Sequence, residues 1–224
     1  MAAFKLQLSG QNFYADLGKI VCVGRNYAAH AAELNNPLPS EPLLFIKPAN
    51  TVVPLAQPFA IPGDQGAVHH ELELAILIGK PLRAAQPEEI LPAIAGIGLA
   101  LDLTLRDVQD RLKREGHPWE RAKAFDGSYP VSNFISPQGH DPQNLTLQLW
   151  RNGQLQQDGH TSQMLFPVIP LIVEISRIFS LVPGDIVSTG TPAGVGPLQP
   201  GDHLFATLGA QAPGDLLRVE TRVS

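Results

Sequence analysis

Most apolar positions in the chain lie in short runs that alternate with polar residues or are rich in Val, Ile and Leu. Such runs, when bounded by Gly, Pro or Asn, are typical of β-strands. They predict strands at Lys19–Val23, Leu43–Lys47, Thr51–Val53, His69–Ile78, Leu145–Arg151, Ile186–Ser188 and His203–Leu208. Helices are rarer: alanine content favours one at Ala28–Leu34, and helical spacing predicts one at Phe166–Phe179. Residues 105–115 carry mixed charge and predict an exposed helix. The pattern predicts a mixed α+β fold in which strands dominate.

Turn residues add to this division of the chain. Asn152-Gly153 separates two alternating runs and predicts a β-hairpin. The Gly-rich segment Thr189–Gly196 can offer backbone N–H groups to an anion, but it lacks the Gly-Lys-Ser/Thr ending of a nucleotide-binding P-loop. The first residues predict a short hairpin. We therefore expect an N-terminal β arm at residues 1–16 and one main domain at residues 17–224.

The composition of the chain limits the binding partners and the cellular locations that we expect for this protein. The formal net charge is −5 and Lys and Arg do not cluster, so nucleic acid is not an expected partner. The single cysteine, Cys22, excludes an internal disulfide and a Cys-based zinc site, and its apolar neighbours predict a buried thiol. The chain has neither a run of about 20 apolar residues nor a secretion signal. We therefore expect a cytoplasmic protein that does not enter membranes.

Two acids, Glu71 and Glu73, stand within the strand predicted at His69–Ile78. Alternate residues of a strand share a face, which places the two carboxylates roughly 7 Å apart. Like charges at that spacing, beside apolar positions, call for protonation or a cation, and Mg²⁺, Mn²⁺ and Ca²⁺ prefer oxygen ligands. The alternative is an edge strand whose glutamates are solvated.

Asp102 is a third acid in an unusual place, because it lies in the apolar run Ile94–Thr104. A buried carboxylate persists only when it is paired or bound to metal. With Glu71 and Glu73 it would complete a three-carboxylate cation site, and pairing with an Arg or Lys is the alternative.

Other polar residues could carry chemistry near such a site. His30 and Glu33 are three apart on the predicted helix, where a carboxylate could orient a histidine base, although such pairs are common on surfaces. Lys47 and Lys123 interrupt apolar surroundings and could extend to solvent or hold an anion. Arg25 and Arg106 are further candidates for binding a carboxylate.

Six segments, taken in order, resemble the fumarylacetoacetate hydrolase family over about residues 17–210. They are Val23-Gly24-Arg25-Asn26-Tyr27, Phe45-Ile46-Lys47-Pro48, His70-Glu71-x-Glu73-Leu74, Lys123-x-Phe125-Asp126 with Pro130-Val131-Ser132, Asn152-Gly153 with Gln157-Asp158-Gly159, and Thr189-Gly190-Thr191-Pro192-x-Gly194-Val195-Gly196.

The resemblance implies a mixed β-sheet roll, a homodimer, and Mg²⁺ or Mn²⁺ (Ca²⁺ in vitro) held by Glu71, Glu73 and Asp102. It implies that residues 26–36 form a lid carrying the His30–Glu33 pair, and that Lys123 is the active-site lysine. It also places Arg106, Gln109 and Thr191 beside the substrate, to which we add Arg25.

The implied activity is metal-dependent cleavage of a C–C bond in a 2,4-dioxo or β-keto 2-oxo acid through a stabilised enolate. Acylpyruvate hydrolysis, with water activated by His30 and Glu33, and oxaloacetate decarboxylation both fit this description. One alternative is an isomerase or decarboxylase of hydroxymuconate-type diacids from aromatic breakdown. The other is a non-catalytic binding protein stabilised by a metal ion.

Overall fold

Strands dominate the computed structural model, which describes residues 4–137, 139–210 and 214–224. The strands are β1 Gln7–Leu8, β2 Gln11–Asn12, β3 Ile20–Gly24, β4 Leu43–Lys47, β5 Val52–Pro54, β6 Val68–His70, β7 Leu72–Ile78, β8 Ile94–Leu101, β9 Thr104–Leu105, β10 Tyr129–Val131, β11 Leu145–Arg151, β12 Gln154–His160, β13 Ile186–Ser188, β14 Gly196–Pro197, β15 His203–Ala210 and β16 Asp215–Arg222. The helices are α1 Ala28–Glu33, α2 Pro87–Ala93, α3 Arg106–Glu115, α4 Glu120–Lys123 and α5 Val168–Ile178, with 3-10 turns at Ala49–Thr51 and Thr161–Gln163. This confirms the prediction of a mixed α+β fold rich in strands.

A seven-stranded mixed sheet in the order β4-β3-β13-β7-β8-β10-β5 forms the centre of the molecule. Strand β7 lies in its middle, antiparallel to both β13 and β8. All seven residues of β7 are buried. The hypothesis of a solvated edge strand for Glu73 is therefore wrong.

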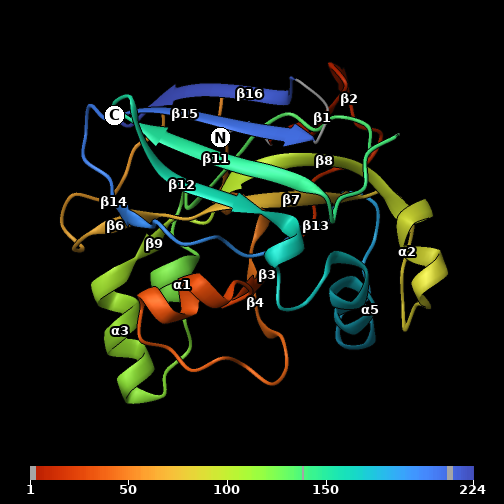
Figure 1. The fold of residues 1–224 in the computed structure, drawn as a ribbon, viewed down its shortest axis with the longest axis horizontal. Helices are drawn as coiled ribbons and strands as arrows, with labels where there is room; N and C mark the ends of the chain where they lie inside the picture. The colour runs from red at the N-terminus through yellow and green to blue at the C-terminus, as the bar shows by residue number, and fades with distance from the viewer. Residues whose placement is uncertain (1–3, 138, 211–213) are drawn as a thin grey trace.

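A four-stranded antiparallel sheet, β12-β11-β15-β16, packs over one face of the central sheet (Figure 1). Leu72, Leu74, Ile76 and Ile78 join the core between the two sheets, where they meet residues such as Leu147. Ala75 and Leu77 point the other way, into a second buried cluster. Glu73 shares the alternation of Ala75 and Leu77, so its carboxylate lies on the opposite face from the leucines, as predicted.

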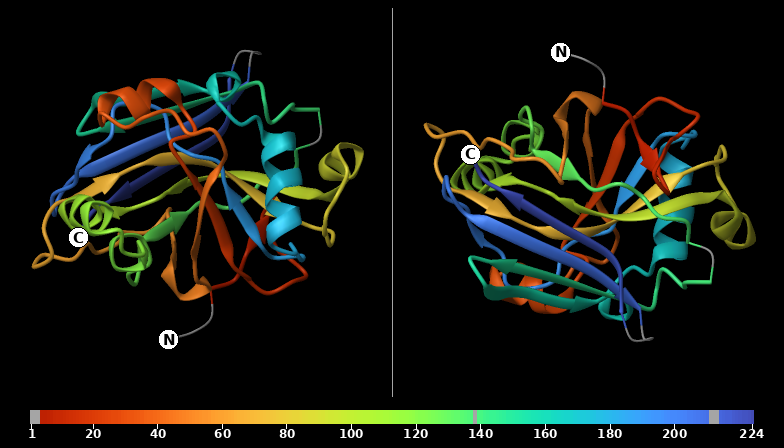
Figure 2. Two further views of the ribbon diagram at one scale, coloured as in Figure 1. Left: turned by 90° about the horizontal axis from the view of Figure 1, so that it is seen from below. Right: turned by 90° about the horizontal axis from the view of Figure 1, so that it is seen from above.

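The helices gather at two ends of these sheets. Figures 1 and 2 show α1 and α3 at one end and α2 and α5 at the other. None of the helices in the described ranges is both long and apolar enough to cross a membrane. Helix α3 differs from the exposed helix that its mixed charge predicts, because Arg106, Gln109 and Leu112 form a buried face.

The predicted hairpin is present: β11 and β12 pair on either side of Asn152 and Gly153, whose φ angles of 53° and 77° suit the tight turn. Near the N-terminus, β1 and β2 pair, and Leu8 bridges to Phe134 of the main body. The division into an arm at residues 1–16 and a domain at 17–224 stays a prediction, as do the homodimer, the cytoplasmic location and the absence of nucleic-acid binding.

Candidate active site

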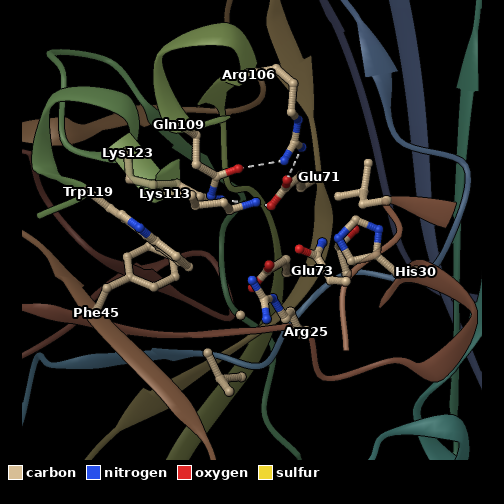
Figure 3. A pocket seen from close by; sticks show the side chains of 15 residues that line it. Arg25, His30, Phe45, Glu71, Glu73, Arg106, Gln109, Lys113, Trp119 and Lys123 are labelled. Carbon is tan, nitrogen blue, oxygen red and sulfur yellow. Dashed lines mark hydrogen bonds and ion pairs between the residues drawn. The ribbon is translucent and has the colours of Figure 1, made fainter. Parts of the chain in front are cut away.

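A pocket at the end of the molecule that carries α1 and α3 brings together most of the polar residues singled out in the sequence (Figure 3). Its lining includes Arg25, His30, Glu71, Glu73, Arg106, Gln109, Lys113, Trp119, Lys123 and Thr191. The cavity is small, about 30 Å³, so a ligand larger than a few waters requires lining side chains to move.

Glu71 lies at a break between two strands, not within one continuous strand as the alternation predicts. Strand β6 ends at His70 and pairs with β9 and β14, whereas β7 begins at Leu72 in the central sheet. The Glu71 carbonyl accepts a hydrogen bond from the Asp102 N–H at 2.9 Å, which ties the break to the end of β8. This kink still leaves one carboxylate oxygen each of Glu71, Glu73 and Asp102 within 4.8 Å of one another.

The Glu71 carboxylate is buried between two cations. Lys123 Nζ lies 2.8 Å from Oε2, and Arg106 donates to Oε1. Burial alone would raise the pKa of Glu71, but Lys123 and Arg106 outweigh it and hold the pKa well below its usual range.

Glu73 has no cation against it among the described residues. Its Oε2 accepts hydrogen bonds from Ser188 Oγ at 2.5 Å and from the Gly190 N–H at 2.9 Å. Burial, together with repulsion from Asp102, raises the pKa of Glu73 to about 8. Among the three acids, Glu73 is therefore the one that no lysine or arginine of the described residues contacts.

Asp102, only 1% exposed, is paired with lysine as well as placed beside the two glutamates. Lys123 Nζ donates to Oδ2 at 2.6 Å, and Lys47 Nζ lies 2.8 Å from Oδ1. Lys47 donates its hydrogen bonds to the carbonyls of Leu103, Lys123 and Ser128. The positive charge of Lys47 therefore lies beside Oδ1 of Asp102, which accepts no aligned hydrogen bond. Both expectations for Asp102, pairing and membership of the acid cluster, are met.

The three carboxylates fit a hard divalent cation. They offer oxygen ligands within reach of one point. Two of these acids keep acceptor capacity: Glu73 is buried without a contacting cation, and Oδ1 of Asp102 has no aligned hydrogen-bond donor. Lys47 is fully buried behind the cluster, so it neither extends to solvent nor lines the pocket.

Helix α1 is short and fixed at both ends. Before it, the buried Asn26 side chain donates to the carbonyls of Phe166 and Thr189 and accepts from the Phe166 N–H. After it, Asn35 adopts a left-handed conformation with a φ of 52°. The N–H groups of Asn35 and Asn36 donate to the carbonyls of Ala32 and Ala31, which is a Schellman ending.

His30 and Glu33 form the pair that their spacing predicts. His30 Nδ1 lies 3.2 Å from Glu33 Oε2, and His30 is only 5% exposed, so the pair is not surface decoration. A carboxylate at Nδ1 favours the tautomer whose Nε2 carries the lone pair. Glu33 also accepts from the Gly194 N–H at 3.0 Å, which ties α1 to the Gly-rich turn. Gly194 has a φ of +96°, and a Cβ there would lie 1.9 Å from the Gln156 carbonyl oxygen.

Gln157 is a buried residue whose role its own position in the sequence did not reveal. Its Oε1 accepts from the Leu72 N–H and contacts His70 Nδ1, while its Nε2 donates to Thr191 Oγ1 and to the Pro192 carbonyl. The Thr191 hydroxyl in turn donates to the Leu72 carbonyl at 2.8 Å. Thr191 lines the pocket, but its hydroxyl hydrogen is already donated to the Leu72 carbonyl.

The sequence matches the family described as fumarylacetoacetate (FAA) hydrolase C-terminal over residues 19–223. The chain belongs to the fumarylacetoacetate hydrolase family. The expected curled, strand-rich family fold is confirmed by a structure from Oleispira antarctica, described as a putative fumarylacetoacetate isomerase/hydrolase. That chain is 57% identical, superposes with a TM-score of 0.96, and the match covers 99% of this chain and 100% of the other.

Two further relatives bear on the chemistry of this family member. The Escherichia coli protein named oxaloacetate tautomerase YcgM is 55% identical over 193 residues, which are 85% of this chain and 88% of the relative. A fumarylpyruvate hydrolase from Pseudomonas aeruginosa, whose structure contains Mn²⁺ and pyruvate, is 35% identical with a TM-score of 0.90, over 100% of this chain and 96% of the other. The family membership and the buried acid triad together indicate an enzyme that uses a divalent metal ion.

Proposed function

We propose that this protein acts on oxaloacetate and related 2-oxo acids, interconverting keto and enol forms with the help of a divalent cation. The observation that carries the proposal is that His30 lines the same pocket as Glu71 and Glu73. Glu33 contacts His30 from outside the pocket lining, and Asp102 completes the acid triad in the same way. The 55% identity to a protein named oxaloacetate tautomerase supports the choice of substrate.

Glu71, Glu73 and Asp102 would hold Mg²⁺ or Mn²⁺, which polarises a 2-oxo group and favours loss of a proton from the adjacent carbon when bound. Each acid keeps free lone pairs for this role, because Lys123 and Arg106 occupy only part of the carboxylate surface. In this proposal the three acids bind the cation, and they do not transfer the proton of the substrate.

His30 is the proposed base. With Glu33 at Nδ1, the Nε2 lone pair of His30 would take the proton from C3 of the keto form, and His30 would return this proton to the 2-oxygen to give the enol. The reverse sequence returns the proton to C3. Burial of His30 and the small cavity limit the access of bulk water to this exchange.

Cleavage is the second candidate function, because the same pair can activate water. For an acylpyruvate, His30 would deprotonate a water that attacks the acyl carbonyl, the C3–C4 bond would break, and C3 would take up a proton to leave pyruvate. For oxaloacetate, breaking the same bond releases CO₂ and needs no attacking water. The similarity to a fumarylpyruvate hydrolase favours this activity, and the hydroxymuconate-type alternative would use the same residues.

The test follows the absorbance of enol oxaloacetate with Mg²⁺ present, for the unaltered protein and for Glu73→Gln and Asp102→Asn. We expect fast ketonisation that both substitutions reduce strongly, while the exposed Glu88→Gln serves as a matched control. Rapid hydrolysis of acetylpyruvate or fumarylpyruvate without any acceleration of ketonisation would instead establish cleavage as the function. No turnover of any oxo acid would leave the non-catalytic alternative.

A further inference from the structure

The cations around the pocket differ in what they contact. Lys123 and Arg106 are both engaged with Glu71, and Lys123 with Asp102 as well. Arg106 also donates to Gln109 Oε1 at 2.7 Å. The charges of these two cations are therefore committed to the acid cluster, although the Arg106 Nε is buried without a hydrogen-bond partner.

Arg25 and Lys113 line the same pocket without an acid of the pocket against them, among the residues that the structure describes. The Arg25 Nε is buried with no hydrogen-bond partner. Lys113 has one acidic neighbour, the half-exposed Asp110, at a loose 3.7 Å. Two charged groups with unused hydrogen-bond capacity therefore face one small cavity.

The backbone holds Arg25 in this place. It follows β3 directly and has a φ of 58°, a left-handed conformation that arginine rarely adopts. The next residue is Asn26, whose side chain is bonded to Phe166 and Thr189 on two other segments. Such a strained position persists because neighbouring contacts fix it, and strain of this kind is common at binding sites.

Lys113 reaches the pocket from α3. It lies four residues after Gln109 and seven after Arg106, so the three share one face of the helix. Its ammonium nitrogen is 5.7 Å from the centre of the Trp119 ring, and its side chain is 21% exposed. In Figure 3, Lys113 and Trp119 lie on one side of Glu71 and Glu73, and His30 lies on the other.

The charge balance favours an anion here. Burial lowers the pKa of Lys113, and Arg106 and Arg25 add to the lowering, whereas Asp110 and Glu71 oppose it. Lys113 thus lies within the field of two arginines, and an anionic ligand would relieve the repulsion among the three groups. The Trp119 ring covers one side of the Lys113 ammonium group, and less water there strengthens a charge-assisted hydrogen bond.

We propose that Lys113, together with Arg25, binds the distal carboxylate of a dicarboxylate substrate, the one not attached to the 2-oxo carbon. The proposal rests on the proposed function, since it assumes that the 2-oxo group lies beside Glu71, Glu73 and His30. Lys113 then determines specificity: it favours oxaloacetate over acetylpyruvate, which has a methyl ketone in place of the distal carboxylate.

The test compares Lys113→Met with the unaltered protein on oxaloacetate and on acetylpyruvate, with Mg²⁺ present. Methionine keeps the unbranched stem against Trp119 and removes the charge. We expect kcat/KM for oxaloacetate to fall about 10- to 100-fold, the range for losing one hydrogen bond to a charged group, and that for acetylpyruvate to change less than about twofold. Lys113→Arg should restore much of the loss, and the exposed Lys80→Met is the matched control.

Equilibrium binding separates failure of the subsite from failure of the proposed function. Calorimetric titration with malate, which carries a distal carboxylate, and with oxalate, which does not, needs no turnover. Lys113→Met should weaken malate about tenfold or more and leave oxalate unchanged, even if neither keto acid is a substrate. Equal losses for the two ligands, or no loss for malate, would overturn the proposal.

Discussion

Replacing Glu33 by glutamine tests the His–Glu pair with minimal change of shape. Glutamine keeps the side-chain length, so Oε1 can still accept from the Gly194 N–H, now as a neutral acceptor. The charged contact with His30 Nδ1, 3.2 Å away, is lost. The change thus weakens the orientation and charge stabilisation of the His30 imidazole while leaving the acid triad untouched.

The size of the effect follows from this geometry. A hydrogen bond to a charged group contributes about 1.5–3 kcal/mol, and Glu33 is about one-third exposed, which places it toward the lower end. At 1.36 kcal/mol per tenfold, the cost to a step that creates a charged His30 is roughly 10- to 100-fold in kcat. Loss of CO₂ from oxaloacetate does not require His30 to become charged, so kcat for decarboxylation should fall by less than about threefold.

The assay measures kcat for acetylpyruvate hydrolysis, for oxaloacetate ketonisation and for CO₂ release in the same preparation. Glu41→Gln, an exposed glutamate in the segment after α1, is the matched control and should change none of them. Loss confined to the first two activities is the expected result. Unchanged hydrolysis and ketonisation would remove the pair from the mechanism, and an equal loss of all three would indicate that α1 has merely been displaced.

Four further outcomes follow from the buried polar contacts around the site. Because the pKa of Glu73 is raised to about 8, the affinity for Mn²⁺ measured by calorimetry should fall about tenfold per unit as the pH drops below 8, and should level off above it. The same shift means that metal-free protein loses stability in thermal melts as the pH rises from about 4 toward 8, because only the folded state retains this proton. Lys47→Met leaves three buried carbonyls and Asp102 without their cation, which should cost about 3–5 kcal/mol and lower the Tm by roughly 6–20 °C. Gln157→Leu frees Thr191 from the loop contact, so KM should rise about tenfold while Tm also falls, and Gln157→Glu should recover only part of the KM.

Alternation and turn chemistry were sufficient to predict much of the fold. The hairpin at Asn152 and Gly153 follows from two residues that tolerate positive φ between alternating strands. The predicted α1 ends within one residue of the observed helix, because Asn35 provides the left-handed ending. The break at Glu71 was missed, because β6 pairs with β9 and β14 whereas β7 pairs with β13 and β8, and local periodicity does not encode such distant partners.

The three acids of the candidate site could be predicted from the sequence, whereas most of the residues that surround them could not. An aspartate inside an apolar run is anomalous in any sequence, and it drew attention to the two glutamates of the alternating run His69–Ile78. Lys113 and Gln157 are different, because a lysine on a charged helix or a glutamine in a hairpin strand looks ordinary in a sequence. The fold brings Lys113 to the pocket and Gln157 against Thr191, which lines it. The burial of Arg106 and Gln109 on α3 shows the same limit, since mixed charge alone indicates exposure.

The central claim is that three buried acids hold a divalent cation on which the chemistry depends. Its most direct test is the rate of oxaloacetate ketonisation by protein stripped with EDTA and dialysed, before and after addition of stoichiometric Mg²⁺ or Mn²⁺. The account predicts that the stripped protein is inactive, that either cation restores activity with one ion per chain, and that Asp102→Asn abolishes the restoration. Full activity of the stripped protein, unchanged by either cation, would contradict it.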